Sequence, residues 1–318
     1  MLITYFTLTK ENQLKTVSEE QDADWIHIES PTTKEILETT NHYHFPSDYL
    51  SAVLDNQEIS RHEGFKQDSI ETPLLLLLQF PQTVISPSGF EQIEALPFSL
   101  ILTQDKLITS CNVPLDLLPN LVKGKAFKTN IKTPEKIAIQ LAWHFSDLFN
   151  YYLKSIKLKT DHLESELHQA TENQQLFQLM DMQKSLVYFD SALEQNLHVL
   201  ENARTSLLIM SSEASQGALY DIIVETKQAI ASGKIQTELL AQLSNLFSAI
   251  VSNNMNIVMK VLTVITIVLT IPTIIGGIYG MNVELPFATE KNAFWWLIIL
   301  TVTFSLLTFW YLRKKKFF

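Results

Sequence analysis

Residues 261–283 read VLTVITIVLTIPTIIGGIYGMNV, and none of these 23 residues carries a charge. Residues 292–312, NAFWWLIILTVTFSLLTFWYL, are equally free of charge. A helix of about 20 apolar residues crosses the hydrocarbon core of a bilayer. Two such stretches, separated only by residues 284–291, predict an antiparallel pair of transmembrane helices.

The residues that flank the two stretches predict their orientation. Arg313 and the lysines at 314–316 follow the second stretch directly, and positive clusters of this kind stay on the cytoplasmic side. The connector carries one lysine against two glutamates, as expected of an extracellular segment. We therefore expect a cell-membrane protein with cytoplasmic N- and C-termini. Its predicted parts are a first span at 257–281, an extracellular loop at 282–291, a second span at 292–312 and a basic cytoplasmic tail at 313–318.

The chain before the spans divides into two regions. Residues 1–130 mix strand-like and helix-like segments, including the buried strand PLLLLLQF at 73–80 and a hairpin around Gln104 and Asp105. Residues 131–256 contain no proline after Pro134, and their apolar residues recur at helical spacing. We expect an α+β membrane protein, in which a cytoplasmic α/β module precedes long helices. The long helices are predicted at about 134–170, at 174–212, and from about 216 into the first span.

Composition and motifs exclude several classes of function. The formal net charge is −10, whereas nucleic-acid binding needs a basic face. No glycine-rich phosphate loop, catalytic triad or zinc-binding helix motif is found in the sequence. We therefore expect neither an enzyme nor a bound cofactor, and we expect membrane lipid rather than nucleic acid as a partner.

One face of the first span carries polar and small residues. Steps of seven from Asn256 and from Met259 give two series offset by three, which together follow a single helix face. This polar stripe consists of Asn256, Met259, Thr263, Thr266, Thr270, Thr273, Gly277 and Gly280. It is compatible with a wet pore lined by oxygen dipoles and with a tight packing seam of small residues. Because two helices enclose no pore, the first interpretation requires several copies of the chain.

The end of the stripe carries a recognisable motif. GIYGMN at 277–282 closes the first uncharged stretch and is followed by a short loop, a second span and a terminal basic cluster. In these features the chain resembles the CorA family of magnesium channels. The segments DWIHIESPT at 24–32 and LDNQEISRHE at 54–63 are also similar to this family.

The resemblance implies a homopentamer with an α/β/α cytoplasmic domain, a funnel of long helices, and passive Mg²⁺ uptake driven by the membrane potential. It implies a selectivity filter formed by Gly280, Met281 and Asn282, in which amide and carbonyl oxygens hold hydrated Mg²⁺. It also implies an apolar constriction at Met259 and Leu262. The pore-lining residues implied in this way are Asn256, Met259, Leu262, Thr266, Thr270, Thr273 and Gly277.

The resemblance further implies that cytoplasmic Mg²⁺ closes the pore by binding between subunits, so that Mg²⁺ is both substrate and regulatory ligand. The helix acid of that site corresponds to Asp221. At the position of its usual partner the sequence has Ser51, with Asp48 and Asp55 nearby. Asp221 and Asp55 are therefore the candidate regulatory ligands, and a solvated helix-face carboxylate is the alternative interpretation of Asp221.

Two other functions remain open from the sequence. The motif does not distinguish a Mg²⁺ channel from a Co²⁺, Ni²⁺ or Zn²⁺ transporter of the same superfamily, for example of the ZntB kind. A two-span membrane sensor or scaffold without a pore is a third possibility. Such a scaffold has no need of a continuous polar stripe.

Overall fold

The computed structural model describes residues 2–9, 13–65, 73–115, 118, 133–166, 173–204, 212–283, 285–286 and 290–315. Some predicted features lie outside these residues. They are the ends of two long helices (167–170 and 205–211), part of the connector (284 and 287–289) and the last residues of the basic tail (316–318). The chain divides into two compact units, Met1–Ser244 and Asn245–Phe318.

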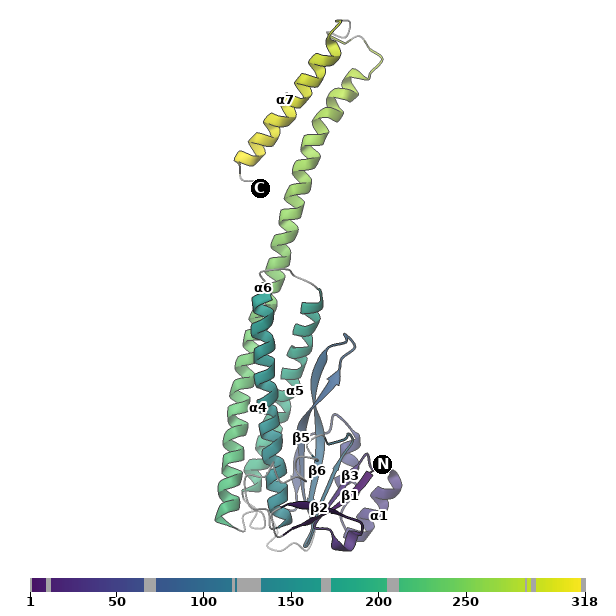
Figure 1. Ribbon diagram of the computed structural model, residues 1–318, viewed down its shortest axis with the longest axis vertical. Coiled ribbons are helices and arrows are strands. Elements are labelled where there is room, and N and C mark those ends of the chain that lie inside the picture. The colour runs from purple at the N-terminus through teal and green to yellow at the C-terminus, as the bar shows by residue number, and fades with distance from the viewer. Residues whose placement is uncertain are drawn as a thin grey trace. The chain divides into compact units, whose positions relative to one another are not determined.

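The first unit is built on a seven-stranded mixed sheet (Figure 1). The strands follow the order β2-β1-β3-β7-β6-β5-β4, and only β3 and β7 are parallel. The β6–β7 pair is the hairpin predicted around Gln104 and Asp105. The strands are β1 (Leu2–Leu8), β2 (Leu14–Val17), β3 (Trp25–Glu29), β4 (Arg61–Glu63), β5 (Leu74–Ile85), β6 (Glu91–Leu102) and β7 (Leu107–Cys111).

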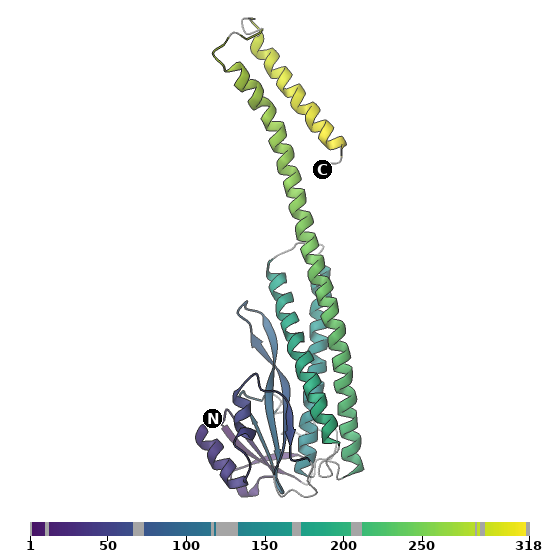
Figure 2. The same cartoon turned by 180° about the vertical axis from the view of Figure 1, so that it is seen from behind.

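Helices cover both faces of this sheet, which confirms the predicted α/β/α architecture (Figures 1 and 2). The face with the short helices carries α1 (Thr33–Tyr43), α2 (Asp48–Ser51) and the 3₁₀ turn η2 (Ala52–Leu54), and a second 3₁₀ turn η1 spans Glu20–Asp22. The opposite face carries α4 (Pro134–Glu166), α5 (Asn173–Ala203) and the beginning of α6 (Glu213–Tyr279). These bounds confirm the three predicted long helices.

The strand β5 shows why the sheet is buried on both sides. Leu74, Leu76 and Leu78 belong to the core beneath α4 and α5, whereas Leu75 and Leu77 belong to the core beneath α1 and α2. Successive side chains of a strand point to opposite faces. The uninterrupted leucine run is therefore the sequence signature of a strand with a hydrophobic layer on each side.

The helices α1 and α2 begin differently. Thr32 forms a capping box with Glu35, in which each side chain bonds the other residue's backbone N–H. Ser47 makes no side-chain cap hydrogen bond, because its backbone is already in the right-handed helical region. The helix α2 has only four residues and continues directly into the 3₁₀ turn η2.

Two short edge strands, β2 and β4, and the first half of β6 were not predicted. Edge strands are short and half exposed, so they lack the apolar run that identifies a buried strand. Pro81 and Pro97 also interrupt the pattern of β5 and β6. Each proline lies where only one neighbouring strand is paired, and a residue without an N–H is tolerated there.

The helix α5 closes the open edge of β5 with a buried asparagine. The N–H of Gln79 donates to Asn196 Oδ1 at 2.8 Å, and Asn196 Nδ2 donates to the Gln79 carbonyl at 2.8 Å. The same Oδ1 accepts from the Ser60 hydroxyl at 2.8 Å. Asn196 thus takes the place of a further strand beyond the end of β4.

Replacing Asn196 with leucine is expected to lower the melting temperature of the full-length protein in detergent by about 5–10 °C. The change leaves both backbone groups of Gln79 and the Ser60 hydroxyl without their partner, and each buried unpaired group costs about 1–3 kcal/mol. Circular dichroism during heating measures the shift. The control is Asn202→Leu, at a site where the amide bonds the carbonyl of His198 in its own helix. Equal shifts in the two variants would contradict the role given to Asn196.

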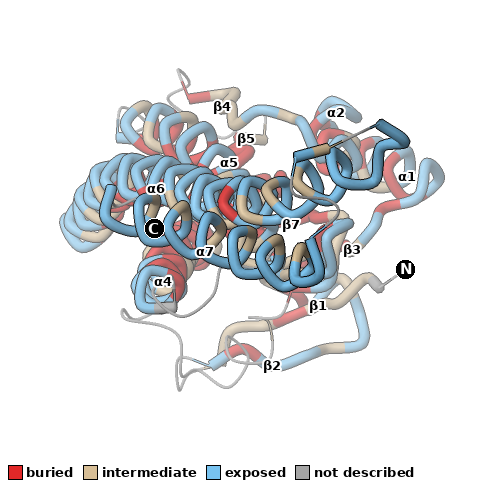
Figure 3. Tube along the Cα trace, turned by 90° about the horizontal axis from the view of Figure 1, so that it is seen from above, coloured by how far each residue is buried: buried red, intermediate tan, exposed pale blue. Residues whose placement is uncertain are grey.

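The second unit is a helical hairpin made by the end of α6 and by α7 (Ala293–Lys314). Both helices are long and apolar enough to cross a membrane. Seen along the long axis, α7 is mostly exposed, with scattered residues of intermediate burial (Figure 3). An exposed apolar surface of this size predicts contact with lipid or with other chains.

Candidate functional site

The end of α6 has one partly shielded face, which we assign to its contact with α7, and its opposite face is exposed. The shielded residues repeat at intervals of three and four, and Val264 among them is only 2% exposed. At 3.6 residues per turn, this face lies about 180° around the helix from the polar stripe. The shielded residues of α6 are Val261, Val264, Val268, Ile271 and Ile275, and those of α7 are Ala293, Leu297, Thr301, Ser305, Thr308 and Leu312.

Every residue of the polar stripe is exposed in the single chain. All the predicted pore-lining positions from Asn256 to Gly277 lie on α6, and Leu262 lies at the border of the stripe. Because α7 occupies the other side of α6, the chain itself provides no cover for the stripe. A role in a pore and a role in a packing seam both require another copy.

The four threonine hydroxyls of the stripe have a common geometry. Each donates its proton to a backbone carbonyl one turn earlier, at distances of 2.8 Å for Thr263, 2.8 Å for Thr266, 2.7 Å for Thr270 and 2.9 Å for Thr273. The outward part of each hydroxyl is therefore an oxygen lone pair. The water molecules around a hydrated cation point their protons outward. The stripe consequently offers acceptors suited to such a complex.

The motif GIYGMN lies where α6 ends, and the end of the helix determines the backbone contacts of Gly280. The Gly280 N–H donates to the Gly276 carbonyl at 2.9 Å, and a Cβ at Gly280 would lie 3.1 Å from that same oxygen. A backbone oxygen has little freedom to move, so glycine fits this position best. Met281 and Asn282 follow in an exposed bend. The Tyr279 hydroxyl donates to the Pro286 carbonyl at 3.3 Å, which ties the start of the connector to the helix end.

The structure places the two candidate regulatory acids on different elements. Asp221 is exposed on α6 and lines a surface hollow of about 440 Å³ together with Glu225, Gln140 and Trp143. Asp55 follows η2, and its carboxylate accepts from the Gln57 N–H at 2.9 Å. The structure shows no direct contact between the two acids. Their predicted joint role requires Asp55 of one chain and Asp221 of another.

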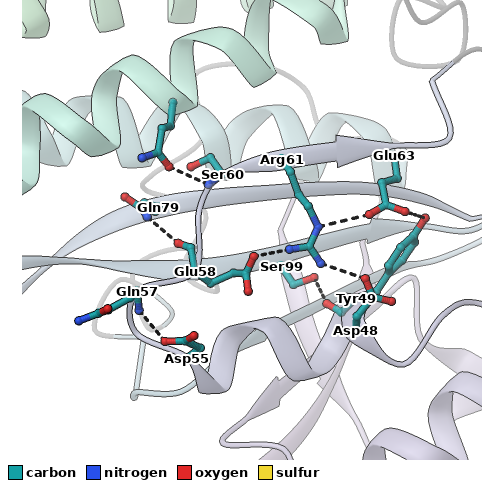
Figure 4. A network of polar contacts seen from close by, with 11 residues as sticks. Asp48, Tyr49, Asp55, Gln57, Glu58, Ser60, Arg61, Glu63, Gln79 and Ser99 are labelled. Carbon is teal, nitrogen blue, oxygen red and sulfur yellow. Dashed lines mark hydrogen bonds and ion pairs between the residues drawn. The ribbon is translucent and has the colours of Figure 1, made fainter.

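Arg61, which the sequence analysis did not identify, forms ion pairs with three acidic residues close to Asp55 in the sequence (Figure 4). Arg61 lies between three carboxylates, with Nη2 at 3.0 Å from Asp48, Nε at 3.3 Å from Glu63, and Nη1 bonded to Glu58. Asp48 is therefore already paired with a cation. Glu63 also accepts from the Tyr49 hydroxyl at 3.1 Å, and burial together with Glu63 raises the pKa of Tyr49.

Within one chain, the residues that the structure describes include no group of three or more His, Cys, Asp or Glu that could hold a metal ion. A cation site made by these side chains would thus be completed by neighbouring chains or would bind a hydrated ion. The sequence predicted the polar stripe of α6, but it did not predict the shielded apolar face opposite to it. The sequence signal for this face was the spacing of three and four residues between its apolar side chains from Val261 to Ile275. The signal was weak because Val and Ile also occur on the other faces of this helix.

Comparisons with known proteins are consistent with this geometry. Residues 20–314 match the sequence model of a family described as CorA-like Mg²⁺ transporter protein. The chain is 24% identical over 296 residues to the cobalt/magnesium transport protein CorA of Methanocaldococcus jannaschii, covering 92% of this chain and 90% of that one.

Solved structures show the same fold. The complete CorA structure from M. jannaschii superimposes with a TM-score of 0.74 at 20% identity and covers 98% of both chains. The full-length CmaX protein gives 0.69 at 20% identity, covering 98% of this chain and 97% of that one. The cytoplasmic domain of ZntB from Vibrio parahaemolyticus gives 0.58 at 13% identity, with coverages of 79% and 96%.

Proposed function

The chain belongs to the CorA-like Mg²⁺ transporter family, and from this premise we propose that it is a Mg²⁺-selective channel subunit of the cell membrane. Membership makes it a membrane transporter of divalent cations rather than an enzyme, which removes the alternative of a non-conducting scaffold. The finer proposal is passive Mg²⁺ uptake driven by the membrane potential, with both termini in the cytoplasm.

The threonine geometry of the polar stripe is the observation that carries this proposal. A lining of oxygen lone pairs accepts hydrogen bonds from the water shell of a cation. Mg²⁺ gives up its water reluctantly, so a path for the hydrated ion avoids the cost of removing that water. The described part of the stripe carries no charge, so it does not hold a divalent ion too tightly to release it.

The proposed path is formed by several copies of the chain, five if the family resemblance extends to the assembly, with the polar stripes facing a common axis. The α7 helices then lie outside the α6 helices, because α7 covers the face opposite the stripe. In this arrangement Asn282, Met281 and Gly280 form the outer ring of the path. Met259 and Leu262 form an apolar constriction toward the cytoplasmic end, which closes by losing its water.

Regulation by cytoplasmic Mg²⁺ is proposed at the contact between first units of neighbouring copies. Asp221 and Asp55 are the acids proposed to take part, and Asp48 is a poorer candidate because its carboxylate already pairs with Arg61. An ion that binds the closed arrangement more tightly shifts the equilibrium toward closure.

Flux into proteoliposomes tests the choice of ion. The purified full-length protein is reconstituted, a membrane potential is imposed, and Mg²⁺ entry is followed with an internal fluorescent indicator. We expect Mg²⁺ to enter and Co²⁺, Ni²⁺ and Zn²⁺ to compete at higher concentrations. Preferential entry of Zn²⁺, Co²⁺ or Ni²⁺, with Mg²⁺ excluded, would overturn the assignment of Mg²⁺. The resemblance in fold to the ZntB domain makes that outcome the second candidate function.

A further inference from the structure

The second unit carries most of its positive charges at one end, and neither of its two acidic side chains lies at that end. Between residues 245 and 318 the sequence has only two carboxylate side chains, Glu284 and Glu290, and both lie in the connector. The other end of the hairpin carries Arg313 and Lys314 in the last turn of α7, Lys315 directly after it, and Lys260 on α6. A chain with a net charge of −10 thus has a local basic cluster that its own second unit does not neutralise.

Aromatic rings hold two of these lysines at the end of α7. The Lys314 ammonium lies 5.1 Å from the centre of the Trp310 ring, and the Lys315 ammonium lies 5.8 Å from the centre of the Tyr311 ring. Both distances are within the range of cation–π attraction. Trp310 and Tyr311 are themselves exposed. Tryptophan and tyrosine at the end of a span favour the depth of the lipid headgroups, so the two ammonium groups are held at that depth.

Lys260 extends the cluster onto the neighbouring helix. It lies 19 residues before the end of α6 at Tyr279, and Lys314 lies 21 residues after the start of α7 at Ala293. At 1.5 Å per residue the two positions are roughly 28 and 32 Å from the connector end of the hairpin. The difference is less than one helical turn, so both helices present positive charge at nearly the same depth.

We propose that this cluster, Lys260, Arg313, Lys314 and Lys315, binds the headgroup of an anionic phospholipid. The charge of the site and its depth in the membrane favour a lipid phosphate as the occupant. A guanidinium binds phosphate oxygens through two parallel hydrogen bonds, and each ammonium has three N–H donors. Within the described part of the second unit, Arg313, Lys314 and Lys315 form no ion pair with a carboxylate side chain, since the acidic residues of that unit belong to the connector. The donors of the cluster are therefore available to a lipid.

Native mass spectrometry of the full-length protein tests the proposal without measuring transport. The protein in detergent is titrated with phosphatidylglycerol or with phosphatidylcholine of the same acyl chains, and the ratio of the two binding constants is determined. We expect tighter binding of phosphatidylglycerol. In the double variant Lys314→Gln/Lys315→Gln this preference falls about 25-fold, because each basic residue near the headgroups contributes about fivefold.

Two control variants separate a lipid site from a general effect of charge. Lys314→Arg/Lys315→Arg keeps both charges and retains the preference. Lys154→Gln/Lys157→Gln removes two exposed lysines from α4 in the first unit and also leaves the preference unchanged. An equal preference in the wild type and in Lys314→Gln/Lys315→Gln would overturn the proposal, as would an equal loss in the α4 control. Failure of Mg²⁺ flux would overturn the proposed function alone, because lipid binding is measured separately.

Discussion

Replacing Asn282 with alanine is expected to reduce Mg²⁺ flux into proteoliposomes at least about tenfold. Asn282 lies in the exposed bend after α6, and in the proposed assembly its amide faces the hydrated ion. A hydrogen bond to a charged partner contributes about 1.5–3 kcal/mol, which corresponds to a factor of ten or more. Each copy of the chain loses one such bond, so the entrance loses affinity at every position of the ring.

The control for this variant removes an asparagine amide from a position that faces away from the proposed path. Asn254 is exposed on α6 and lies roughly 140° around the helix from the centre of the polar stripe. Asn254→Ala is expected to keep most of the flux. Initial rates at equal amounts of reconstituted protein provide the comparison. Unchanged flux in Asn282→Ala would remove Asn282 from the selectivity filter.

Replacing Gly277 with valine is expected to block conduction and leave the assembly intact. A Cβ at Gly277 meets no atom within 4 Å in the single chain, so the hairpin itself accepts the larger residue. In a pore, several added isopropyl groups converge on one axis. They narrow the path and replace a polar surface with an apolar one, so the expected loss of flux is about tenfold or more.

Gly276 provides a matched control, since it also has open space around its Cβ position and lies about 100° around the helix. Gly276→Val is expected to retain flux. Size-exclusion chromatography with light scattering reports the oligomeric state of both variants. If Gly277→Val instead dissociated the assembly, the stripe would be a packing seam, as the sequence alone also allowed. The two interpretations of the stripe therefore predict different results.

Much of the fold could be predicted because its signals are local. The length of the two uncharged stretches indicates membrane spans, and the long proline-free region indicates helices. The leucine run at 73–80 indicates a buried strand. The edge strands β2 and β4 could not be predicted, since their pairing is with residues distant in sequence. The extent of β6 depends likewise on its pairing with all of β5.

The candidate pore was predicted more readily than the candidate regulatory site. A repeat of seven along one helix is visible in sequence, and so is a motif at its end. Arg61 was not predicted because its three carboxylate partners come from α2, from the loop before β4 and from β4 itself. Only the folded chain shows that Asp48 is paired and that the nearby Asp55 forms no ion pair with any residue that the structure describes.

The four threonine hydroxyls of the polar stripe donate their protons to carbonyls of their own helix, and this bears on whether a pore would leak protons. Proton hopping needs groups that accept a proton on one side and release one on the other. Here each hydroxyl proton points back to a carbonyl of its own helix, so these side chains provide no link in such a relay. In the proposed pore, a hydrated metal ion would pass without these side chains forming part of a route that discharges the proton gradient.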